Sequence, residues 1–567
     1  MNMSDPIKGS YILMESLLKE GVDTIFGYPG GSIIPVFDAL YDYMDRFNYL
    51  LMRHEQGAVH AAEGYARVSG KPGICIVTSG PGATNTITGI GDAMMDSTPI
   101  IVITGQVGAA SLGTDAFQEI DMVGITQPIT KWACQIRSAD EIADAVAKAF
   151  YISTTGRPGP VVLDFTKNAQ TELASFQYKQ CTYYRGYIPA PHVNAEQIKE
   201  AAHLINQAQK PFAIIGQGVV LSNAEKELMQ FLKKADIPAA STLLGLSAIP
   251  TDFKLNKGFV GMHGNIAPNM KTNECDVLIA IGMRFDDRVT GNPNTYAKQA
   301  KIIHIDIDPA EIDKNVRTTT KVLGDAKEAL TALIQAIEPA HHDAWIQSFE
   351  AYEQKEQKTV IEKELYHEGE HITMSEIVRK VSDATQREAI LVTDVGQNQM
   401  ASARYFQYKH TRSIVTSGGL GTMGFGIPAA IGAKVGAPQR TVCLFVGDGG
   451  FQMTIEELGT IMQSKIGVKM ILLNNNYLGM VRQWQELFFQ KRYSSTQMIN
   501  PDFNQIADAY HIANRKVSNR SEIDEAIQDM LKDDQAYLLV VEVEENGLIY
   551  PMIPAGETVT NILTPHS

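Results

Sequence analysis

The sequence is poor in cysteine, and the five cysteines that it has are scattered singly. They are Cys75, Cys134, Cys181, Cys275 and Cys443, and they lack the paired spacing of a zinc site. Disulfide frameworks use cysteines in pairs and belong to oxidising compartments, so the odd number argues against such a framework. The cysteine pattern therefore predicts a protein of the reducing cytoplasm.

Runs of basic residues are also absent. The chain as a whole is acidic, with 49 Lys and Arg against 64 Asp and Glu and a formal charge of -15. An acidic chain without a basic patch gives no electrostatic support to a nucleic-acid surface or an anionic membrane. The N-terminus enters a helical pattern near Ile12, without the regions of a signal peptide or the Arg- and Ser-rich composition of a presequence. We expect a cytoplasmic protein with neither a nucleic-acid nor a membrane partner.

The chain alternates short apolar runs with amphipathic segments along its 567 residues. Each run ends in Gly, Ser, Thr or Asp, which is typical of a buried strand that leads through a loop into a helix. The runs are TIFGYPGG, ICIVTSGPG, IVITGQ, FAIIGQG, VLIAIG, IIHIDID, AILVTDVG, TVCLFVGDGG and MILLNNN. The pattern predicts an α/β fold with parallel sheets, and ligands are expected beyond the carboxyl ends of the strands.

Two stretches interrupt this alternation and divide the chain. Residues 176–193 and the charged residues 338–370 have the composition of linkers or connecting helices. Because one hydrophobic core stops growing well below this chain length, several domains are expected. We predict three doubly wound parallel-sheet domains, over residues 1–180, 190–345 and 365–567.

The most specific local pattern is Gly447-Asp448-Gly449 after one predicted strand and Asn474-Asn475 after the next. A single βαβ crossover returns the second strand beside the first, so that two oxygen ligands face one point. Mg²⁺ takes oxygen ligands and is often completed by phosphates, so the pair suits a metal-bound diphosphate. Taken separately, the aspartate is a helix cap and the asparagines are turn residues. Together they form the pattern typical of thiamine-diphosphate enzymes.

Glu55 is the candidate for activating such a cofactor. Thiamine diphosphate reacts at a weakly acidic carbon, and a carboxyl bonded to its pyrimidine recruits the cofactor's own amino group as the base. Glu55 follows the strand-like NYLLM and opens the helical QGAVHAAEGYAR, although a first-turn acid favoured by the helix dipole is the plain alternative. Two glycine-rich loops, Gly27 to Gly31 and Gly80 to Asn85, also end predicted strands, and tight turns explain them equally well.

Longer motifs resemble one family over nearly the whole chain. They are FGYPGG, RHEQGAVHAAEGYAR, TSGPGATN, GTDAFQE, TGRPGPVVLDFTK, GMHG, RFDDRVTGN, HIDIDPAEI, TSGGLGTMGFG, GDGGFQMT, NNNYLGMVRQWQ and YPMIPAG. On these motifs the chain resembles the large, catalytic subunits of acetohydroxyacid synthase (acetolactate synthase), in the thiamine-diphosphate superfamily. The resemblance implies pyrimidine-binding, FAD-associated and diphosphate-binding domains, in that order. It implies an enzyme that decarboxylates pyruvate and transfers the two-carbon unit to pyruvate or 2-ketobutyrate. The products would be 2-acetolactate or 2-aceto-2-hydroxybutyrate, on the way to branched-chain amino acids.

The same resemblance implies roles for individual residues. The implied catalytic residues are Glu55, Gln118, Lys167 and Gly31. The implied Mg²⁺ ligands are Asp448, Asn475 and the carbonyl of Tyr477. The implied thiamine-diphosphate contacts are Pro29, Asn85, Gln397, Asn398, Gly421, Met423, Gly447, Gly449 and Met480. Among them, Met423 is implied as the apolar wedge that holds the cofactor bent.

The walls of the substrate channel are likewise implied by the resemblance, and they are Phe117, Met262, Arg288, Met480, Val481 and Trp484. Arg288 suits a clamp for the carboxylate of the second ketoacid, because a guanidinium pairs with a carboxylate in two-pronged geometry. A surface salt bridge is its alternative. Trp484 is implied to favour 2-ketobutyrate over pyruvate, an apolar contact worth about 1 to 3 kcal/mol per methylene. Its alternative, shared with Met480, is a buried helix face.

FAD is expected in the middle domain. A lone GxG such as Gly216-Gln217-Gly218 is weak evidence. The run RFDDRVTG, however, resembles the FAD-containing biosynthetic members of the family rather than the flavin-free catabolic ones. The implied FAD contacts are Arg157, Gly216, Gly218, His263, Gly282, Arg284, Asp306 and Asp325. In the family this flavin is structural rather than redox-active.

One segment departs from the family pattern. The chain reads DVGQNQMAS, with Asn398 where the family commonly has histidine and Ala401 where it has an aromatic residue. Asparagine still donates a hydrogen bond to phosphate, so a change in cofactor affinity is expected. The superfamily builds each active site from two subunits, which implies a homodimer or tetramer. The family also implies a small regulatory subunit and small 2-ketoacids as the ligands.

Two other functions share some of these features. An oxidoreductase of pyruvate-oxidase type combines the same cofactors but passes electrons through the flavin. A non-catalytic regulatory paralogue would keep the fold. The intact Glu55, Asp448 and Asn475 argue against that second alternative.

Overall fold

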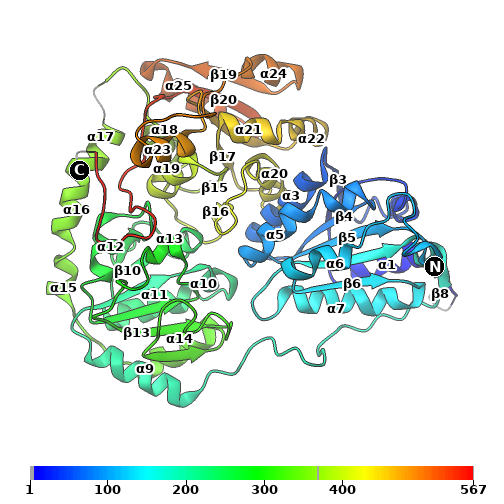
Figure 1. Ribbon diagram of the computed structural model, residues 1–567, viewed down its shortest axis with the longest axis horizontal. Helices are drawn as coiled ribbons and strands as arrows, with labels where there is room; N and C mark the ends of the chain where they lie inside the picture. The colour runs from blue at the N-terminus through cyan, green and yellow to red at the C-terminus, as the bar shows by residue number, and fades with distance from the viewer. Residues whose placement is uncertain (1–4, 367–368, 566–567) are drawn as a thin grey trace.

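The computed structural model describes residues 5–366 and 369–565, and these contain three parallel sheets of six strands each. Figure 1 shows the N-terminal domain in blue and cyan, the central domain in green, and the C-terminal domain in yellow and orange. The predicted fold class is confirmed. The strands bury side chains on both faces, as in the fully buried IIVITGQ of residues 100–106, because helices cover both sides of each sheet.

The N-terminal sheet has the strand order β3-β2-β4-β5-β7-β6. Its strands are β2 (Thr24–Tyr28), β3 (Asn48–Leu51), β4 (Gly73–Val77), β5 (Ile100–Gln106), β6 (Trp132–Ile136) and β7 (Val161–Thr166). Its helices are α1 (Gly9–Lys19), α2 (Ile34–Tyr41), α3 (Glu55–Ser69), α4 (Pro81–Thr84), α5 (Ile87–Met95), η1 (Ala109–Ser111), α6 (Met122–Thr126), η2 (Gln127–Ile129), η3 (Ala139–Glu141), α7 (Ile142–Thr154) and α8 (Lys167–Thr171). A short antiparallel pair, β1 (Ile7–Lys8) with β8 (Leu173–Ala174), joins the two ends of this domain.

The central sheet has the order β11-β10-β9-β12-β13-β14. Its strands are β9 (Pro211–Ile215), β10 (Ala239–Ser241), β11 (Asn256–Phe259), β12 (Val277–Ile281), β13 (Lys301–Asp306) and β14 (Thr320–Leu323). Its helices are α9 (Ala195–Gln207), α10 (Gln217–Leu221), α11 (Glu225–Ala235), η4 (Leu243–Gly245), α12 (Ile266–Thr272), α13 (Asp287–Thr290) and α14 (Ala326–Ala336).

The C-terminal sheet has the order β16-β15-β17-β18-β20-β19. Its strands are β15 (Ile390–Thr393), β16 (Ile414–Val415), β17 (Val442–Gly447), β18 (Val468–Asn474), β19 (Ala513–Val517) and β20 (Tyr537–Glu542). Its helices are α18 (Met374–Ala384), α19 (Gln397–Tyr405), α20 (Gly426–Gly436), α21 (Asp448–Met453), η6 (Ile455–Glu457), α22 (Leu458–Ser464), α23 (Gly479–Phe488), α24 (Phe503–Ala509), η7 (Arg520–Glu522) and α25 (Ile523–Leu531).

The two predicted linkers differ in structure. Residues 176–193 form an extended connection, the long cyan segment at the bottom of Figure 1. Three of its tyrosines, Tyr178, Tyr184 and Tyr187, pack against the N-terminal core. The charged stretch contains α15 (Asp343–Gln347), α16 (Glu350–Glu356), the π-helix η5 (Gln357–Ile361) and α17 (Glu362–Leu365). None of the described helices combines the length and the apolarity needed to cross a lipid bilayer.

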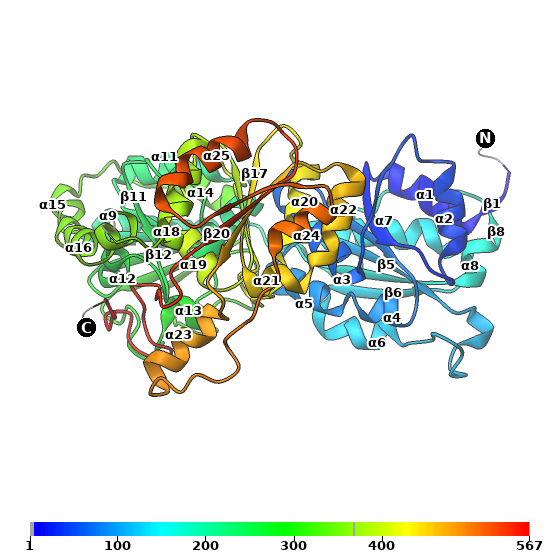
Figure 2. The same cartoon turned by 90° about the horizontal axis from the view of Figure 1, so that it is seen from above.

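Helices α3 and α20 lie side by side and join the N- and C-terminal domains, as both views show (Figures 1 and 2). Glycines on both helices permit the close approach. A Cβ at Gly64 would lie 2.1 Å from the carbonyl oxygen of Ala429, and one at Gly432 would lie 1.8 Å from that of Ala61. The two domains therefore form one continuous hydrophobic core.

The C-terminal tail leaves its own domain and packs on the central one (Figure 2). Ile553 and Val559 are buried in a central-domain cluster, and the Ile553 backbone N–H donates to the Met262 carbonyl at 2.8 Å. The range that we predicted for the C-terminal domain, residues 365–567, thus ends in a segment that packs against the central domain.

Candidate functional site

The predicted cofactor residues follow strands at which the chain order of a sheet reverses. Such a reversal opens a crevice beyond the carboxyl ends of the two strands, where α/β proteins bind ligands. The neighbours β2 and β4, β9 and β12, and β15 and β17 form these reversals. The segments that follow them are Pro29–Gly31 with Gly80–Asn85, Gly216–Gly218 with Gly282, and Gln397–Asn398 with Asp448.

Glu55 is the first residue of α3, and residues 52–54 connect it to the end of β3. His54 caps the helix by accepting from the backbone N–H of Gln56 at 3.1 Å. Asn85 Nδ2 donates to Glu55 Oε2 at 2.9 Å, which joins two predicted residues from different loops. A Cβ at Gly82 would lie 3.1 Å from Glu55 Oε1, so the loop around Gly82 borders the carboxyl group closely.

Other predicted catalytic residues border the same edge of the N-terminal sheet. Gln118 has a left-handed backbone (φ 63°), and its Cβ lies 2.8 Å from the position of a Cβ on Gly80. Gly31 is exposed after β2 with nothing within 4 Å of its Cβ position, and Lys167 is exposed at the start of α8. Phe117 is 89% exposed. These residues face open space in the single chain.

Asp448 opens α21 after β17, and Asn475 follows the neighbouring strand β18. The Asp448 carboxyl is buried, and this burial raises its pKa above the ordinary value. The Asn475 Oδ1 accepts from the backbone N–H of Tyr477 at 3.2 Å. The group thus offers a carboxylate, an amide oxygen and nearby carbonyls, which is the oxygen donor set that Mg²⁺ prefers.

Asn500 orients this group, and the sequence analysis missed it. Its Nδ2 donates to Asp448 Oδ2 at 2.7 Å and to Asn474 Oδ1 at 2.8 Å, and it lies 3.1 Å from Asn476 Oδ1. Gln452 Nε2 donates to the Asn500 Oδ1 at 3.0 Å. The contact crosses from the loop before α24 to two strand ends, so no local spacing in the sequence indicated it.

Met423 lies beside Gly449, the second glycine of the GDG segment. Its Cε is 3.5 Å from the position of a Cβ on Gly449. The loop that carries Met423 is held by the buried Asp394, whose Oδ2 accepts from the backbone N–H of Gly424 at 3.1 Å and of Gly426 at 2.8 Å. Burial raises the pKa of Asp394 above its ordinary value. Asp394 ends the AILVTD run, and this strand-end position was the signal that would have singled it out.

The two residues of the diphosphate segment differ in their bonding. Gln397 Nε2 donates to Gln483 Oε1 at 2.9 Å and to the carbonyl of Gly547 at 2.8 Å, so its amide is already engaged within the protein. Asn398 is buried and 4% exposed, and its Nδ2 makes a long 3.5 Å contact to the Val395 carbonyl. Its Oδ1 has no hydrogen-bond partner within the described part of the chain. The Asn398 Nδ2 is also 3.5 Å from the position of a Cβ on Gly447.

A carboxyl from the C-terminal domain holds the chain that enters α3. Glu457 is fully buried in η6, and its Oε1 accepts the backbone N–H groups of Arg53 and His54 at 3.1 Å each. Thr460 Oγ1 donates to Glu457 Oε2 at 2.6 Å. Burial raises the pKa of Glu457 to about 7, against the lowering effect of these hydrogen bonds.

Helices α3 and α5 also hold the Met423 loop from the other side. Ser417 Oγ donates to Asp92 Oδ1 at 2.8 Å, and Asp96 accepts the N–H groups of Gly418 and Gly419 at 2.8 and 2.6 Å. Arg67 pairs with Asp96 at 2.6 Å.

Asp92 belongs to a buried cluster with His60 and Glu63, in which the potential ligand atoms lie within 4.8 Å of one another. Burial raises the pKa of Asp92 to about 8, with the Glu63 and Asp96 carboxyls adding to it, and raises that of Glu63 well above its ordinary value. The cluster favours neutral carboxyls at this junction of the two domains.

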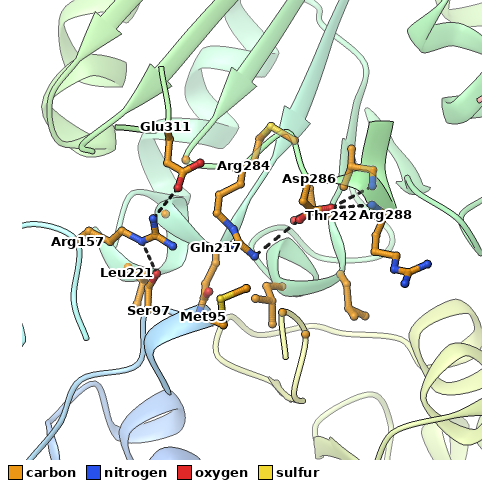
Figure 3. A pocket seen from close by; sticks show the side chains of 18 of the residues that line it. Met95, Ser97, Arg157, Gln217, Leu221, Thr242, Arg284, Asp286, Arg288 and Glu311 are labelled. Carbon is orange, nitrogen blue, oxygen red and sulfur yellow. Dashed lines mark hydrogen bonds and ion pairs between the residues drawn. The ribbon is translucent and has the colours of Figure 1, made fainter. Parts of the chain in front are cut away.

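A cavity of about 940 Å³ lies where the three domains meet (Figure 3). The predicted residues that line it are Arg157, Gly218, Met262, His263, Gly282, Arg284, Arg288, Asp306, Asp325, Gly421, Met480 and Trp484. Its volume is at the upper end of what small-molecule sites enclose, which suits a dinucleotide. Glu55 and Asp448 belong to two other groups of contacting side chains.

Two arginines enter the cavity in Figure 3, Arg157 from the left and Arg284 from above. Arg157 comes from the N-terminal domain and donates to Ser97 Oγ at 2.8 Å, Glu311 Oε1 at 2.9 Å and Asp308 Oδ2 at 3.1 Å. Among the residues that the structure describes, Arg284 has only a long ion pair, 3.8 Å from its Nη2 to an Asp286 oxygen. Its guanidinium therefore has donors left for an anion.

The predicted glycines of the central domain have a structural reason as well. The Gly218 N–H donates to the Gly282 carbonyl at 2.9 Å, and a Cβ at Gly216 would lie 2.1 Å from that same oxygen. Asp306 Oδ1 accepts from the Asp308 N–H at 2.8 Å, and Asp325 caps α14. These contacts support the turns, and they leave the glycine backbones facing the cavity.

His263 is the predicted flavin contact with the most unusual environment. It is buried, and no described residue makes a hydrogen bond to its Nδ1. Burial, with the neighbouring Arg404 cation, lowers the pKa of His263 to about 3. The ring is therefore neutral and offers a hydrogen bond to a neutral or polar group.

The predicted substrate walls are only partly assembled. Arg288 has a 60% exposed side chain and touches Met262 Sδ with its Nη1 at 3.5 Å. Trp484 packs against Phe488 in a tilted arrangement, with ring centroids 5.1 Å apart, on the part of α23 that borders the cavity. Val481 is 48% exposed and does not line this cavity among the described residues.

Three domain profiles match the chain. The profile described as "Thiamine pyrophosphate enzyme, N-terminal TPP binding domain" matches residues 7–125, and the corresponding central domain matches residues 198–333. The C-terminal TPP binding domain matches residues 394–541. Thiamine pyrophosphate (TPP) is another name for thiamine diphosphate.

Full-length relatives are similar to the chain as well. The acetolactate synthase large subunit of Lactococcus lactis subsp. lactis is 43% identical over 560 residues, which cover 98% of this chain and 96% of that protein. The acetolactate synthase isozyme 2 large subunit of Escherichia coli is 43% identical over 559 residues, 98% and 99% of the two chains. The probable acetolactate synthase large subunit of Methanocaldococcus jannaschii is 43% identical over 570 residues, 99% and 95% of the two chains.

Proposed function

This chain belongs to the thiamine pyrophosphate enzymes and, within them, to the acetolactate synthase large subunits, and on that premise we propose how its own residues carry out the synthesis. One pyruvate loses CO₂, and its remaining two-carbon unit is joined to the ketone of a second pyruvate or of 2-ketobutyrate. The products are 2-acetolactate and 2-aceto-2-hydroxybutyrate.

Thiamine diphosphate, when bound, supplies the carbon that attacks the ketone of pyruvate and accepts the electrons left by CO₂. Glu55 supplies and removes the proton at the pyrimidine ring. Asn85 orients the Glu55 carboxyl by the 2.9 Å hydrogen bond to Oε2, which leaves Oε1 for the ring nitrogen. Gly82 has no side chain to fill the space beside Oε1.

The metal and the diphosphate are held by the C-terminal domain. Asp448, the Asn475 amide oxygen and the carbonyl of Tyr477 would bind Mg²⁺. The buried Asp448 carboxyl fits a cation, because a divalent charge offsets the burial that raises its pKa. Asn398, with an unpartnered buried amide oxygen and a weakly bonded Nδ2, would donate to the diphosphate. Met423 would hold the cofactor bent above Gly449.

FAD would occupy the cavity between the three domains. Glycine backbones at Gly218 and Gly282 permit close approach, Arg284 has free donors for a phosphate, and His263 has an unpartnered nitrogen. The ring of His263 stays neutral, which suits contact with an uncharged part of the flavin. A structural role for the flavin agrees with a cavity lined by all three domains.

The second ketoacid would bind at the edge of the same cavity. Arg288 would pair with its carboxylate, since the guanidinium is largely exposed and its contacts, 3.5 Å to Met262 Sδ and 3.7 Å to an Asp287 oxygen, are long. Trp484 and Met480 would contact its alkyl chain. An apolar wall of this kind favours one additional methylene, and hence 2-ketobutyrate over pyruvate.

We propose a homodimer as the smallest active assembly, because the residues around Glu55 and those around Asp448 form separate groups and the former face open space. A second chain would bring the Glu55 group of one subunit to the Asp448 group of the other. The relatives' printed names, "large subunit", support a smaller partner subunit for this chain too.

The observation that carries the proposal is the convergence of Asp448, Asn475 and Met423 at the ends of neighbouring strands, with Glu55 and Asn85 paired in the other domain. The test is Glu55→Gln with saturating thiamine diphosphate and Mg²⁺. We expect acetolactate formation to fall about 10² to 10⁴-fold. Wild-type turnover would remove Glu55 from this role. Asp45→Asn, an exposed acid near the amino end of β3, is the control and should keep full activity.

A further inference from the structure

The segment that opens with Asp448 continues directly into a contact with the other cofactor-binding domain. Helix α21 is followed by η6, and η6 ends at Glu457. Glu457 Oε1 accepts two backbone N–H groups, from Arg53 and His54, the two residues that precede Glu55. Arg53 adds side-chain hydrogen bonds to the same segment, to the Gly459 carbonyl at 3.1 Å and to another residue of α22.

The N-terminal helix is shaped to receive this carboxyl. Gly57 is the third residue of α3, and a Cβ placed there would meet Glu457 Oε1 at 2.2 Å, with the next two nearest atoms also belonging to Glu457. A side chain at Gly57 would therefore have to displace the Glu457 carboxyl. Glu457 is fully buried, so water cannot replace it as the acceptor for the Arg53 and His54 N–H groups.

We propose that Glu457 is a positioning residue, which fixes the start of α3 and through it the place of the Glu55 carboxyl. The inference rests on the proposed role of Glu55. A helix whose first turn is fixed by two hydrogen bonds presents its first side chain in one place. Because Asp448 and Glu457 lie on one continuous segment, the metal-binding strand end and the Glu55 helix are joined through a few residues of a single chain.

The role requires a hydrogen-bond acceptor rather than a charge. Glu457 Oε1 accepts both N–H groups, whereas Oε2 contacts only the Thr460 hydroxyl and, at 3.2 Å, the Arg53 N–H. In Glu457→Gln, Oε1 would keep both N–H bonds. The Gln amide would donate to Thr460 Oγ1, whose own proton can go to the Leu51 carbonyl at 3.2 Å. Glu457→Gln should therefore behave like the wild type, and Glu457→Ala should not.

The experiment compares Glu457→Ala, Glu457→Gln and Glu55→Gln, each purified as the full chain with thiamine diphosphate and Mg²⁺. Three quantities are measured: kcat and KM for pyruvate, the rate of deuterium exchange at C2 of the bound cofactor, and amide exchange at residues 53 and 54 without cofactor. For Glu457→Ala we expect kcat and the C2 exchange rate to fall about 10- to 100-fold, as for a small misplacement of a catalytic group. KM should change little. Amide exchange at both positions should rise about 10- to 100-fold.

A second variant reaches the same contact from the other domain. Gly57→Ala should displace Glu457 without weakening α3, because alanine is the best helix former. It should lower kcat as Glu457→Ala does, and the double variant should be no worse than either single one, since both remove one interaction. Glu456→Gln changes the neighbouring acid, which does not contact Arg53 or His54 through a hydrogen bond, and should keep full activity.

The outcomes separate the two claims. If Glu55→Gln is impaired while Glu457→Ala keeps wild-type kcat and C2 exchange, the positioning role is wrong and the role of Glu55 stands. If Glu457→Gln is as impaired as Glu457→Ala, the acceptor argument is wrong. If Glu55→Gln exchanges the C2 proton at the wild-type rate, the proposed role of Glu55 is wrong. Faster amide exchange at residues 53 and 54 in Glu457→Ala would then show only that Glu457 fixes the start of α3.

Discussion

At the scale of a single residue, the direction of the Asp448 carboxyl depends on Asn500. The Asn500 amide donates to Asp448 Oδ2 and to Asn474, while the other carboxylate oxygen, Oδ1, accepts the backbone N–H of Gly449 at 3.0 Å and keeps a lone pair for a metal. Partners that orient a ligand typically contribute 10- to 100-fold to metal affinity.

We predict that Asn500→Ala raises the Mg²⁺ concentration for half-maximal activation about 10- to 100-fold, with near-normal turnover at saturating Mg²⁺. A Mg²⁺ titration of the apoenzyme with fixed thiamine diphosphate measures it. Gln505→Ala, on the exposed side of α24, is the matched control. An unchanged half-saturation would show that Asp448 is oriented without Asn500.

Trp484 is a second residue whose effect is confined to one contact. It lines the cavity and packs against Phe488. We predict that Trp484→Leu lowers the preference for 2-ketobutyrate over pyruvate by about 1 to 3 kcal/mol, or roughly 5- to 150-fold in product ratio. Competition between the two acceptors, with both products quantified, measures the ratio. Phe489→Leu, at an exposed position, should leave the product ratio unchanged. An unchanged product ratio for Trp484→Leu would mean that other residues determine the acceptor preference.

At the scale of elements, the buried Asp92 carboxyl joins α5 to the loop that carries Met423, and burial favours its neutral form. In the folded protein the pKa of Asp92 is about 8, whereas its ordinary value is 3.8. The folded state therefore holds a proton that the unfolded state releases between about pH 4 and 8, and this group lowers stability progressively as the pH rises.

We predict that Asp92→Asn removes this loss. The melting temperature of the variant, compared with that of the wild type at the same pH, should rise as the pH increases from about 5 to 8. The corresponding difference in the free energy of unfolding should grow by at most about 1.4 kcal/mol per pH unit. Asn keeps an oxygen that accepts from the Ser417 hydroxyl. The control is Asp45→Asn, at an exposed position. A melting-temperature difference that does not change with pH would mean that Asp92 is not protonated in the fold.

At the scale of the whole molecule, the central cavity brings all three domains into contact with one ligand. We predict that FAD at about 100 times its Kd stabilises the protein by roughly 2.7 kcal/mol and raises its melting temperature by a few degrees. Arg284→Gln should weaken this stabilisation, because it removes a guanidinium whose ion pair is long. Thermal unfolding with and without FAD measures both. No shift with FAD in the wild type would contradict flavin binding in this cavity.

The sequence was sufficient for the parts of the molecule that depend on local order. Alternating apolar runs and strand-end glycines predicted three parallel sheets, and the GDG and NN segments predicted the strand ends that meet beside Met423. It was insufficient where residues distant in sequence meet. Asn500, Asp394 and Glu457 act across elements or across domains, and the tail around Ile553 packs on a domain other than its own. Such contacts follow from tertiary packing, which no spacing in the sequence encodes.

The most direct test of the account is product formation from pyruvate by the purified chain with thiamine diphosphate, Mg²⁺ and FAD, with and without 2-ketobutyrate. The account predicts 2-acetolactate from pyruvate alone and diversion to 2-aceto-2-hydroxybutyrate when 2-ketobutyrate is added. Acetate with bleaching of the flavin, or acetaldehyde, in place of these products would contradict it.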